Sequence, residues 1–158
     1  MSSAAASPYG KSRSVNPAFE KCLKDRKIIL FPRAKRLAKK ELAAAEEDLA
    51  EAKDRFEKLR YKYATINAYD AIFHAARALI YSKGYRERSH YCLAVALEAL
   101  FVDKGLFKGR YVRMLRDTMA LRESADYGGA FSKEGASTSI SNAEEFFRAA
   151  ENLVQLGR

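Results

Sequence analysis

The sequence predicts an all-α protein, an up-and-down bundle of four to five helices that follows a flexible basic arm. The 158 residues include only three prolines and eight glycines, so little interrupts the residues that favour helix. Apolar side chains recur every three to four residues over long stretches, which is the spacing of one helix face. We find no window of alternating apolar and polar residues that would predict a half-buried strand.

The net charge of +9 is concentrated at the start of the chain. Residues 1–40 hold eleven Lys and Arg against two acids, whereas residues 41–158 hold eighteen of each sign. Residues 1–15 are rich in Ser and Ala and poor in apolar side chains, which predicts a flexible basic tail. Residues 16–158 are then expected to form a single helical domain. The tail could contact nucleic-acid phosphate or an acidic partner, or remain solvated.

A short helix and an extended segment are predicted before the first long helix. Asn16 and Pro17 are typical of the N-cap and first position of a helix, and residues 28–31 should dock as an apolar strap. The long helix runs from about Ala34 to Arg60. Its heptad spacing also allows a coiled coil. An antiparallel pair with the next helix is favoured, because it requires a less extensive apolar seam. Its apolar seam consists of Leu42, Ala45, Leu49, Ala52, Phe56 and Leu59.

The central helix of the bundle is predicted from Tyr61 to Gly84, where the glycine is a C-terminal cap. Two apolar stripes lie side by side on this helix, so more than one neighbour must cover it. One polar line runs through them, formed by Asn67, Asp70, His74 and Arg77.

Two interpretations of this polar line remain open. The first is a buried structural network that fixes helix register and extends to Arg122, Asp126 and Tyr127. The second is a polar pocket, in which His74 and Arg77 bind a ligand or carry a proton. The first is favoured because an Asp and an Arg that pair on one helix balance each other's charge and require no ligand.

The third helix is predicted from His90 to Lys104, with Ser89 as its N-cap. It is apolar on nearly all sides, so it must be fully buried or shared with a second subunit. The second explanation would make the protein a homodimer.

Two further helices complete the predicted bundle. One runs from about Arg110 to Ala125, and an irregular loop over residues 128–137 follows it. The last begins near Ser141, because Ser141 and Glu144 fit a capping box.

Cys22 and Cys92 are the only cysteines. A disulfide between them is possible. Because they are far apart in the sequence, we predict instead that both are reduced thiols and that the protein is cytoplasmic. The early apolar run IILF, residues 28–31, is far too short to span a membrane. We therefore expect no membrane association.

Three segments together resemble the HEPN domain from Leu37 onward. They are an alanine-rich charged first helix, AYDAIFHAARALIYSKGYRERSHY (residues 68–91) and LRESADYG (residues 121–128). The chain is most similar to small stand-alone prokaryotic HEPN proteins of the type associated with minimal nucleotidyltransferases. The resemblance implies a bundle of four or five helices that is often dimeric.

The resemblance implies one of two functions. Many HEPN proteins are metal-independent ribonucleases, often the toxin of a toxin–antitoxin pair or part of a defence-like module, with a minimal nucleotidyltransferase as the partner. Others are non-catalytic and bind a nucleotide or dock such a partner. Whether this chain is an enzyme is therefore open, and RNA or a nucleotide is the expected ligand.

Catalytic members of the family carry an Arg, then four to six residues, then a His. The candidates here are Arg86 and His90, which are separated by three residues. His90 would transfer a proton, since its pKa lies near neutrality, and Arg86 would stabilise phosphate charge. The alternative is that His90 only packs or caps its helix. Further candidates for binding nucleic acid or nucleotide are Arg88, Lys83, His74 and Arg77.

Other kinds of chemistry find no support in the sequence. It has no Gly-rich phosphate loop, and its two histidines lack the clustered ligands of a transition-metal site. We therefore predict no metal and no cofactor.

Overall fold

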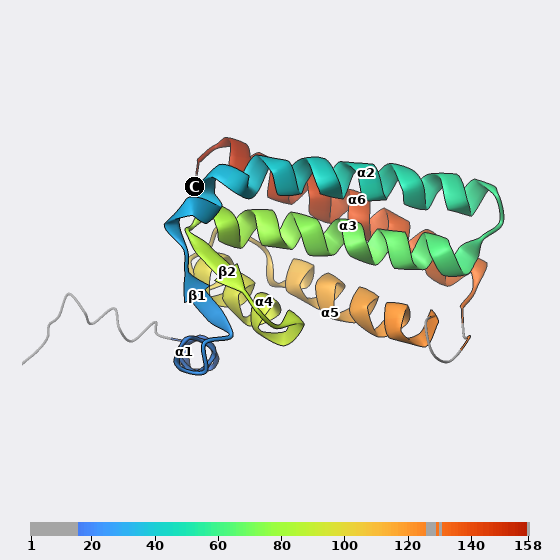
Figure 1. The fold of residues 1–158 in the computed structure, drawn as a ribbon. Helices are drawn as coiled ribbons and strands as arrows, with labels where there is room; N and C mark the ends of the chain where they lie inside the picture. Colours follow the sequence, from blue (N-terminus) through green and yellow to red (C-terminus); the bar gives the residue numbers. More distant parts are fainter. Residues whose placement is uncertain (1–15, 126–128, 130, 158) are drawn as a thin grey trace, which may run out of the picture.

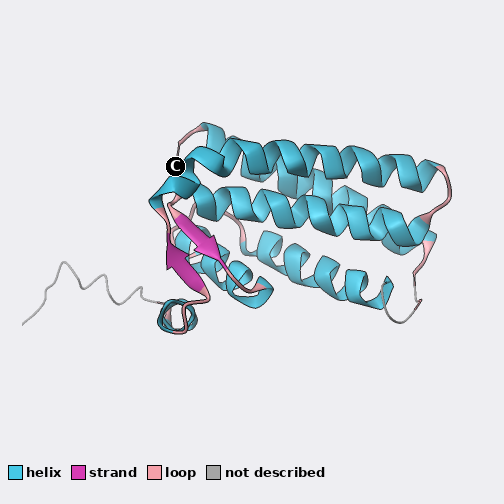
Figure 2. Cartoon of the chain, viewed as in Figure 1, coloured by secondary structure: helices cyan, strands magenta, loops and turns pink. Residues whose placement is uncertain are grey.

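The computed structural model describes residues 16–125, 129 and 131–157. Long helices form a bundle, and a two-stranded sheet and short helices pack at one end (Figure 1). The all-α prediction is confirmed, and Figure 2 shows how small the sheet is beside the helices. The elements are α1 (Pro17–Lys24), β1 (Ile28–Leu30), η3 (Pro32–Leu37), α2 (Ala38–Glu57), α3 (Tyr61–Ser82), β2 (Tyr85–Glu87), α4 (His90–Leu97), η4 (Glu98–Val102), α5 (Gly109–Glu123) and α6 (Lys133–Gln155).

Helix α3 is the centre of the bundle, as its two apolar stripes predict. It contacts α2, α5 and α6, and the shorter elements η3, β2 and α4 pack against it as well. Small side chains make this possible, because alanine lets helix backbones approach closely while it removes apolar surface from water. The fully buried alanines of α3 are Ala64, Ala68, Ala71, Ala75, Ala76 and Ala78.

Helices α2 and α3 form the predicted antiparallel pair, joined by a short turn. The seam of α2 is buried at Leu42, Ala45, Leu49 and Ala52. The prediction is wrong at its end, since Leu59 is 71% exposed. Leu59 lies in the turn with a φ of 62°, so its side chain no longer follows the helical spacing.

The N-terminal elements form a small layer at one end of the bundle. Helix α1 begins as predicted, and the Asn16 side chain accepts a hydrogen bond from the Phe19 N–H at 3.1 Å. Strand β1 pairs with β2 in antiparallel register, with Ile28 opposite Glu87 and Ile29 opposite Arg86. The predicted extended strap is thus a strand. Its pairing was missed because three residues are too few to show a strand pattern.

A disulfide joins Cys22 of α1 to Cys92 of α4, so the prediction of two reduced thiols is wrong. The two cysteines are separated by 70 residues, and both are buried. They meet because α1 packs on α4, a contact that their wide spacing in the sequence could not reveal. The bond anchors the N-terminal layer to the bundle.

The apolar third helix is buried within the chain itself. Every residue from Cys92 to Leu97 is buried, and the segment continues as the π-helical turn η4. This favours the first of the two predicted explanations for its apolar character, burial inside one subunit.

Helix α6 begins earlier than predicted. Its N-cap is Ser132, whose hydroxyl accepts a hydrogen bond from the Gly135 N–H at 2.9 Å. Ala136 and Ser139 are buried in the first turns. Tertiary packing therefore outweighs the capping box at Ser141 and turns much of the predicted loop into helix.

Within the part of the chain that the structure describes, no helix is both long and apolar enough to cross a lipid bilayer. The predicted flexible tail, residues 1–15, lies outside the described residues.

We expect a larger side chain at the α2–α3 contact to destabilise the protein. The Ala45→Leu substitution inserts three carbons where Ala45 is fully buried, and such overpacking costs about 1–3 kcal/mol. The matched control is Ala43→Leu, the same substitution at an exposed position of α2. Urea unfolding of both variants measures the difference. Equal midpoints would contradict close packing at Ala45.

Candidate functional site

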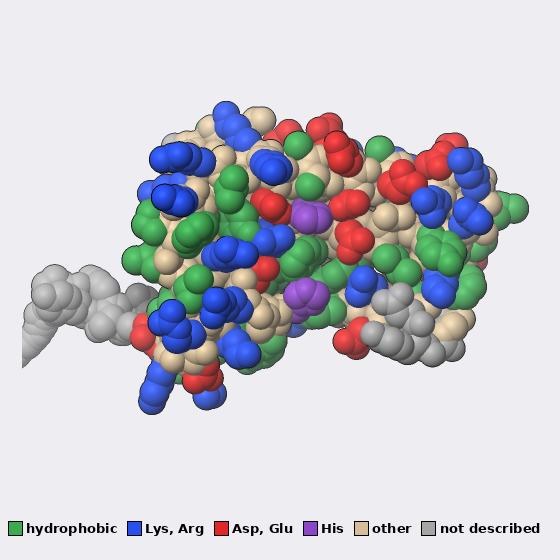
Figure 3. Space-filling model, viewed as in Figure 1, with side chains coloured by type: hydrophobic (Ala, Val, Ile, Leu, Met, Phe, Trp, Pro, Cys, Tyr) green, Lys and Arg blue, Asp and Glu red, His purple; other side chains and the backbone are tan. Residues whose placement is uncertain are grey.

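The two histidines lie on one face of the molecule, at its centre (Figure 3). The ring of Phe73 separates them, with its centroid 5.6 Å from the His74 ring and 4.8 Å from the His90 ring. Helix α3 supplies most of this surface, and α4 and α5 supply the rest. We call it the histidine face, formed by Tyr69, Phe73, His74, Arg77, His90 and Arg122.

His90 is exposed at the first position of α4. Ser89 caps this helix, since its hydroxyl accepts a hydrogen bond from the Cys92 N–H at 3.0 Å. The imidazole stands against Phe73, and its Nδ1 lies 3.2 Å from the Tyr69 hydroxyl. The predicted cap is confirmed, and the structure adds Tyr69 as a partner that holds the ring in place.

The surroundings of His90 keep its imidazole neutral. Partial burial lowers the pKa of His90, Arg122 and Arg77 lower it further, and Asp70 opposes them. Burial raises the pKa of Tyr69 to about 12, so its hydroxyl stays protonated. When His90 Nδ1–H donates to the Tyr69 oxygen, Nε2 is left as an acceptor for a proton. His90 can therefore act as a base near neutral pH.

Arg122 is the cation that α5 contributes to the histidine face. Its Nε lies 3.9 Å from Asp70 Oδ1, and its guanidinium is 5.5 Å from the centroid of the Tyr69 ring. The structure thus brings together two members of the predicted polar network, Asp70 and Arg122. Asn67 lies half-buried on the same helix as Asp70, and Asp126 and Tyr127 are outside the described residues.

His74 lies between two acids of α2. Its Nδ1 is 2.7 Å from Glu41 Oε1, and its Nε2 is 3.7 Å from Asp48 Oδ2. The hydrogen bond to Glu41 raises the pKa of His74. Burial by itself would raise the pKa of Glu41. The hydrogen bond from His74 and the charge of Arg77 outweigh it, so the pKa of Glu41 is lowered. His74 therefore links α2 to α3 through acids that favour its charged form.

Arg77 ties α3 to two other elements. Its Nε is 3.2 Å from Glu87 Oε2 on β2, and its Nη1 is 3.7 Å from Glu41 Oε1 on α2. Its Nη2 also donates a hydrogen bond to the Tyr81 hydroxyl. Burial raises the pKa of Glu87 although Arg77 opposes it. These contacts favour the structural interpretation of His74 and Arg77 over the binding one.

The acids Glu41, Asp48 and Glu87 were missed as members of this site. Helical periodicity places Glu41 and Asp48 on α2 and His74 on α3, but only the packing of the two helices sets them opposite one another. No group of three or more His, Cys, Asp or Glu that could hold a metal ion occurs among residues 16–125, 129 and 131–157.

Arg86 lies on the outer side of β2, where it is exposed. Its guanidinium stands 5.7 Å from the centroid of the Phe31 ring, while its neighbour Glu87 points inward to Arg77. Arg86 thus contacts Phe31 in this structure, and its role together with His90 stays a prediction. Arg88 is exposed on the same side of the strand, and the Lys83 ammonium lies 5.5 Å from the centroid of the Phe101 ring.

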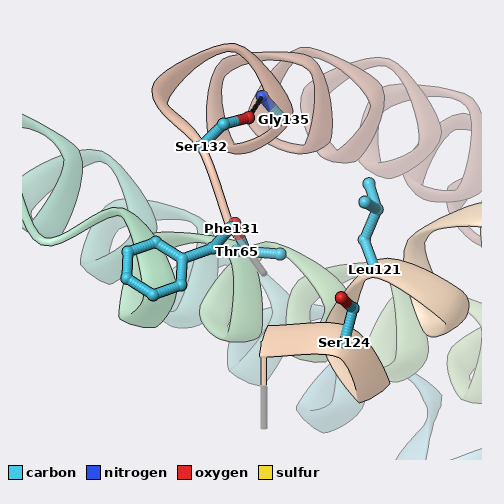
Figure 4. A pocket seen from close by; sticks show the side chains of 6 residues that line it. All are labelled: Thr65, Leu121, Ser124, Phe131, Ser132 and Gly135. Atoms are coloured by element: carbon cyan, nitrogen blue, oxygen red, sulfur yellow. Dashed lines mark hydrogen bonds between the residues drawn. The ribbon is translucent and has the colours of Figure 1, made fainter. Parts of the chain in front are cut away.

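A separate open pocket of about 390 Å³, whose lining includes neither histidine, lies between α3, α5 and the start of α6 (Figure 4). Among the described residues, its lining holds no charged side chain, and its Ser132 hydroxyl already caps α6. The described lining therefore offers no group suited to proton transfer. It is lined by Thr65, Leu121, Ser124, Phe131, Ser132 and Gly135.

The all-α bundle matches the class of protein that the sequence resembles. The sequence model of the HEPN domain matches residues 38–153. The chain belongs to the HEPN family.

Two relatives agree with this assignment. The protein named "Putative toxin MJ0605" from Methanocaldococcus jannaschii is 35% identical over 103 residues, which cover 65% of this chain and 77% of the relative. A UPF0332 protein from Archaeoglobus fulgidus is 31% identical over 116 residues, 72% of this chain and 92% of the relative.

The two histidines should titrate on opposite sides of the ordinary pKa of about 6.5. Folding raises the pKa of His74 because its charged form is stabilised. The stability that His74 adds to the fold is therefore fully present below the ordinary pKa and is lost as the pH rises through the higher pKa of the folded protein. For His90 the folded pKa is lower, so its contribution is lost as the pH falls. Proton NMR of the imidazole C–H resonances should show one curve above the ordinary value and one below it.

The Glu41→Gln substitution should lower the titration midpoint of His74 and leave that of His90 unchanged. The control is Glu46→Gln, which removes an exposed acid from the same helix. Two coincident curves in the parent protein would contradict the environments described for His74 and His90.

Proposed function

We propose that this protein is the RNA-cleaving component of a toxin–antitoxin or defence-like module, and that it cuts single-stranded or tRNA-like RNA without a metal ion. The observation that carries the proposal is the placement of His90, exposed, held by Tyr69, and close enough to Arg122 and Arg77 for both to lower its pKa. Membership of the HEPN family and the toxin name of one relative support it.

His90 would act as the general base. Its Nε2 takes the proton of a ribose 2′-OH, and the 2′-oxygen bonds to the adjacent phosphorus. The bond from phosphorus to the 5′-oxygen breaks, that oxygen takes a proton from solvent water, and the protonated His90 returns its proton to the solvent. The products are a 2′,3′-cyclic phosphate and a 5′-hydroxyl, so the step needs no oxidant and no added group.

Arg122 would stabilise the negative charge on phosphate in the transition state. An arginine suits this role through its planar set of donors. The sequence suggested Arg86 for it, but Arg86 stands over Phe31 and Arg122 stands over Tyr69, the partner of His90. The stabilising charge therefore comes from α5 in this proposal.

The alternative is a non-catalytic HEPN module that binds a nucleotide or docks a minimal nucleotidyltransferase. The observation that favours it is the outer position of Arg86, which leaves the family's Arg–His pair incomplete in its usual form. In either case we propose a homodimer with a nucleotidyltransferase partner, the arrangement that the family resemblance implies.

Incubation of the purified protein with total RNA in EDTA tests the proposed function. Cleavage should occur, and His90→Ala should slow it by roughly 10²- to 10⁴-fold, the range for loss of a general base. Arg122→Gln should slow it by about 10²-fold. The rate should rise with pH through the lowered pKa of His90, since the neutral imidazole is the active form.

The control is Arg113→Gln, which removes an exposed arginine of α5 outside the histidine face. An intact parent that leaves RNA uncut would favour the non-catalytic module. Cleavage that survives His90→Ala at the parental rate would place the chemistry elsewhere.

A further inference from the structure

The N-terminal elements are an addition to the part of the chain that matches the family. The HEPN match begins at residue 38, whereas residues 16–37 form α1, β1 and η3. These residues hold seven Lys and Arg against two acids. One of the acids, Asp25, is already paired with Lys21 at 2.9 Å. The addition therefore brings strong positive charge to the bundle.

Several bonds fix this addition to the segment from Gly84 to Cys92, which contains His90. The Phe31 N–H donates to the Gly84 carbonyl at 2.6 Å, and the Arg88 N–H donates to the Lys27 carbonyl at 2.7 Å. The disulfide then joins α1 to Cys92, two residues beyond His90. Of the added elements, α1 and β1 contact α4, at whose first position His90 is exposed, while η3 packs on α2, α3 and β2.

The exposed cations of the addition lie together with those of β2. Arg86 is opposite Ile29 in the sheet, on the side away from buried Glu87. Figure 3 shows Lys and Arg side chains gathered over this end of the molecule and reaching toward the histidines. We call this surface the basic end, formed by the exposed side chains of Lys27, Arg33, Lys35, Arg36, Arg86 and Arg88.

Apolar groups lie among these cations. Leu30 is 66% exposed, and Arg86 lies close enough to the Phe31 ring for a cation–π contact. Stacking groups among phosphate-binding cations suit a nucleic-acid strand, whose bases and phosphates alternate. An acidic protein segment would need the cations but not the stacking groups.

We propose that the basic end binds the phosphate backbone of RNA on one side of His90. The substrate would then be a strand that extends several nucleotides beyond the phosphodiester bond that is cut. This inference rests on the proposed function for the position of the cut. The binding itself can be tested without cleavage. Recognition through phosphate would be independent of base sequence and sensitive to salt.

The test compares the full chain with a triple variant, Lys27→Gln, Arg33→Gln and Arg36→Gln, on a 2′-O-methyl RNA that cannot be cut. Fluorescence anisotropy gives the affinity at several salt concentrations. Loss of three phosphate contacts should reduce the slope of log affinity against log salt by about 2. A matched triple variant, Arg113→Gln, Lys133→Gln and Arg148→Gln, removes the same charge from exposed positions of α5 and α6 and should keep the parental slope.

Cleavage gives a second readout. The triple variant of the basic end should raise KM for a long RNA about tenfold, because a loss of roughly 1.4 kcal/mol of binding is tenfold, and leave kcat/KM for a dinucleotide unchanged. A parental slope in this variant would overturn the basic end as an RNA-binding surface even if RNA is cut. Loss of binding to polyglutamate but not to RNA would overturn it as well, since that result assigns the surface to an acidic protein. Failure of all cleavage, with the slope reduced as expected, would overturn only the proposed function.

Discussion

The close contact of α2 with α3 is the constraint on which the rest of the structure depends. Buried alanines on both helices let the two backbones approach. That approach sets Glu41 and Asp48 of α2 opposite His74 of α3. The packing of these two helices therefore builds both the core and the acid–histidine contacts on the surface beside it.

The polar line of α3 divides into two parts with different consequences. His74 and Arg77 are surrounded by Glu41, Asp48 and Glu87, so their charges are balanced within the bundle. At the other end, Asp70 meets Arg122, which lies next to Tyr69 and lowers the pKa of His90. The same helix thus favours the charged form of His74 and the neutral form of His90. His90 is exposed and suits proton transfer.

The sheet and the disulfide attach the basic N-terminal segment to the bundle and so determine where its charge lies. The sequence shows the excess of basic residues before residue 38, but not the surface on which they gather. In the structure, β1 pairs with β2, and Cys22 is bonded to Cys92. The cations from residue 21 onward are consequently held against the bundle, on elements that contact α4 (α1 and β1) or α2, α3 and β2 (η3).

The sequence by itself determined the helical class, the central position of α3, the caps at Asn16 and Ser89, and the resemblance to HEPN, because these follow from local spacing and short motifs. It also singled out His90, Asp70 and Arg122. Only the tertiary structure decided that Tyr69 and Arg122 stand beside His90, that Arg86 faces outward, that Cys22 meets Cys92, and that α6 begins at Lys133. The reason is physical: a helical period reports which side chains share one face, but which faces meet depends on how the whole core packs.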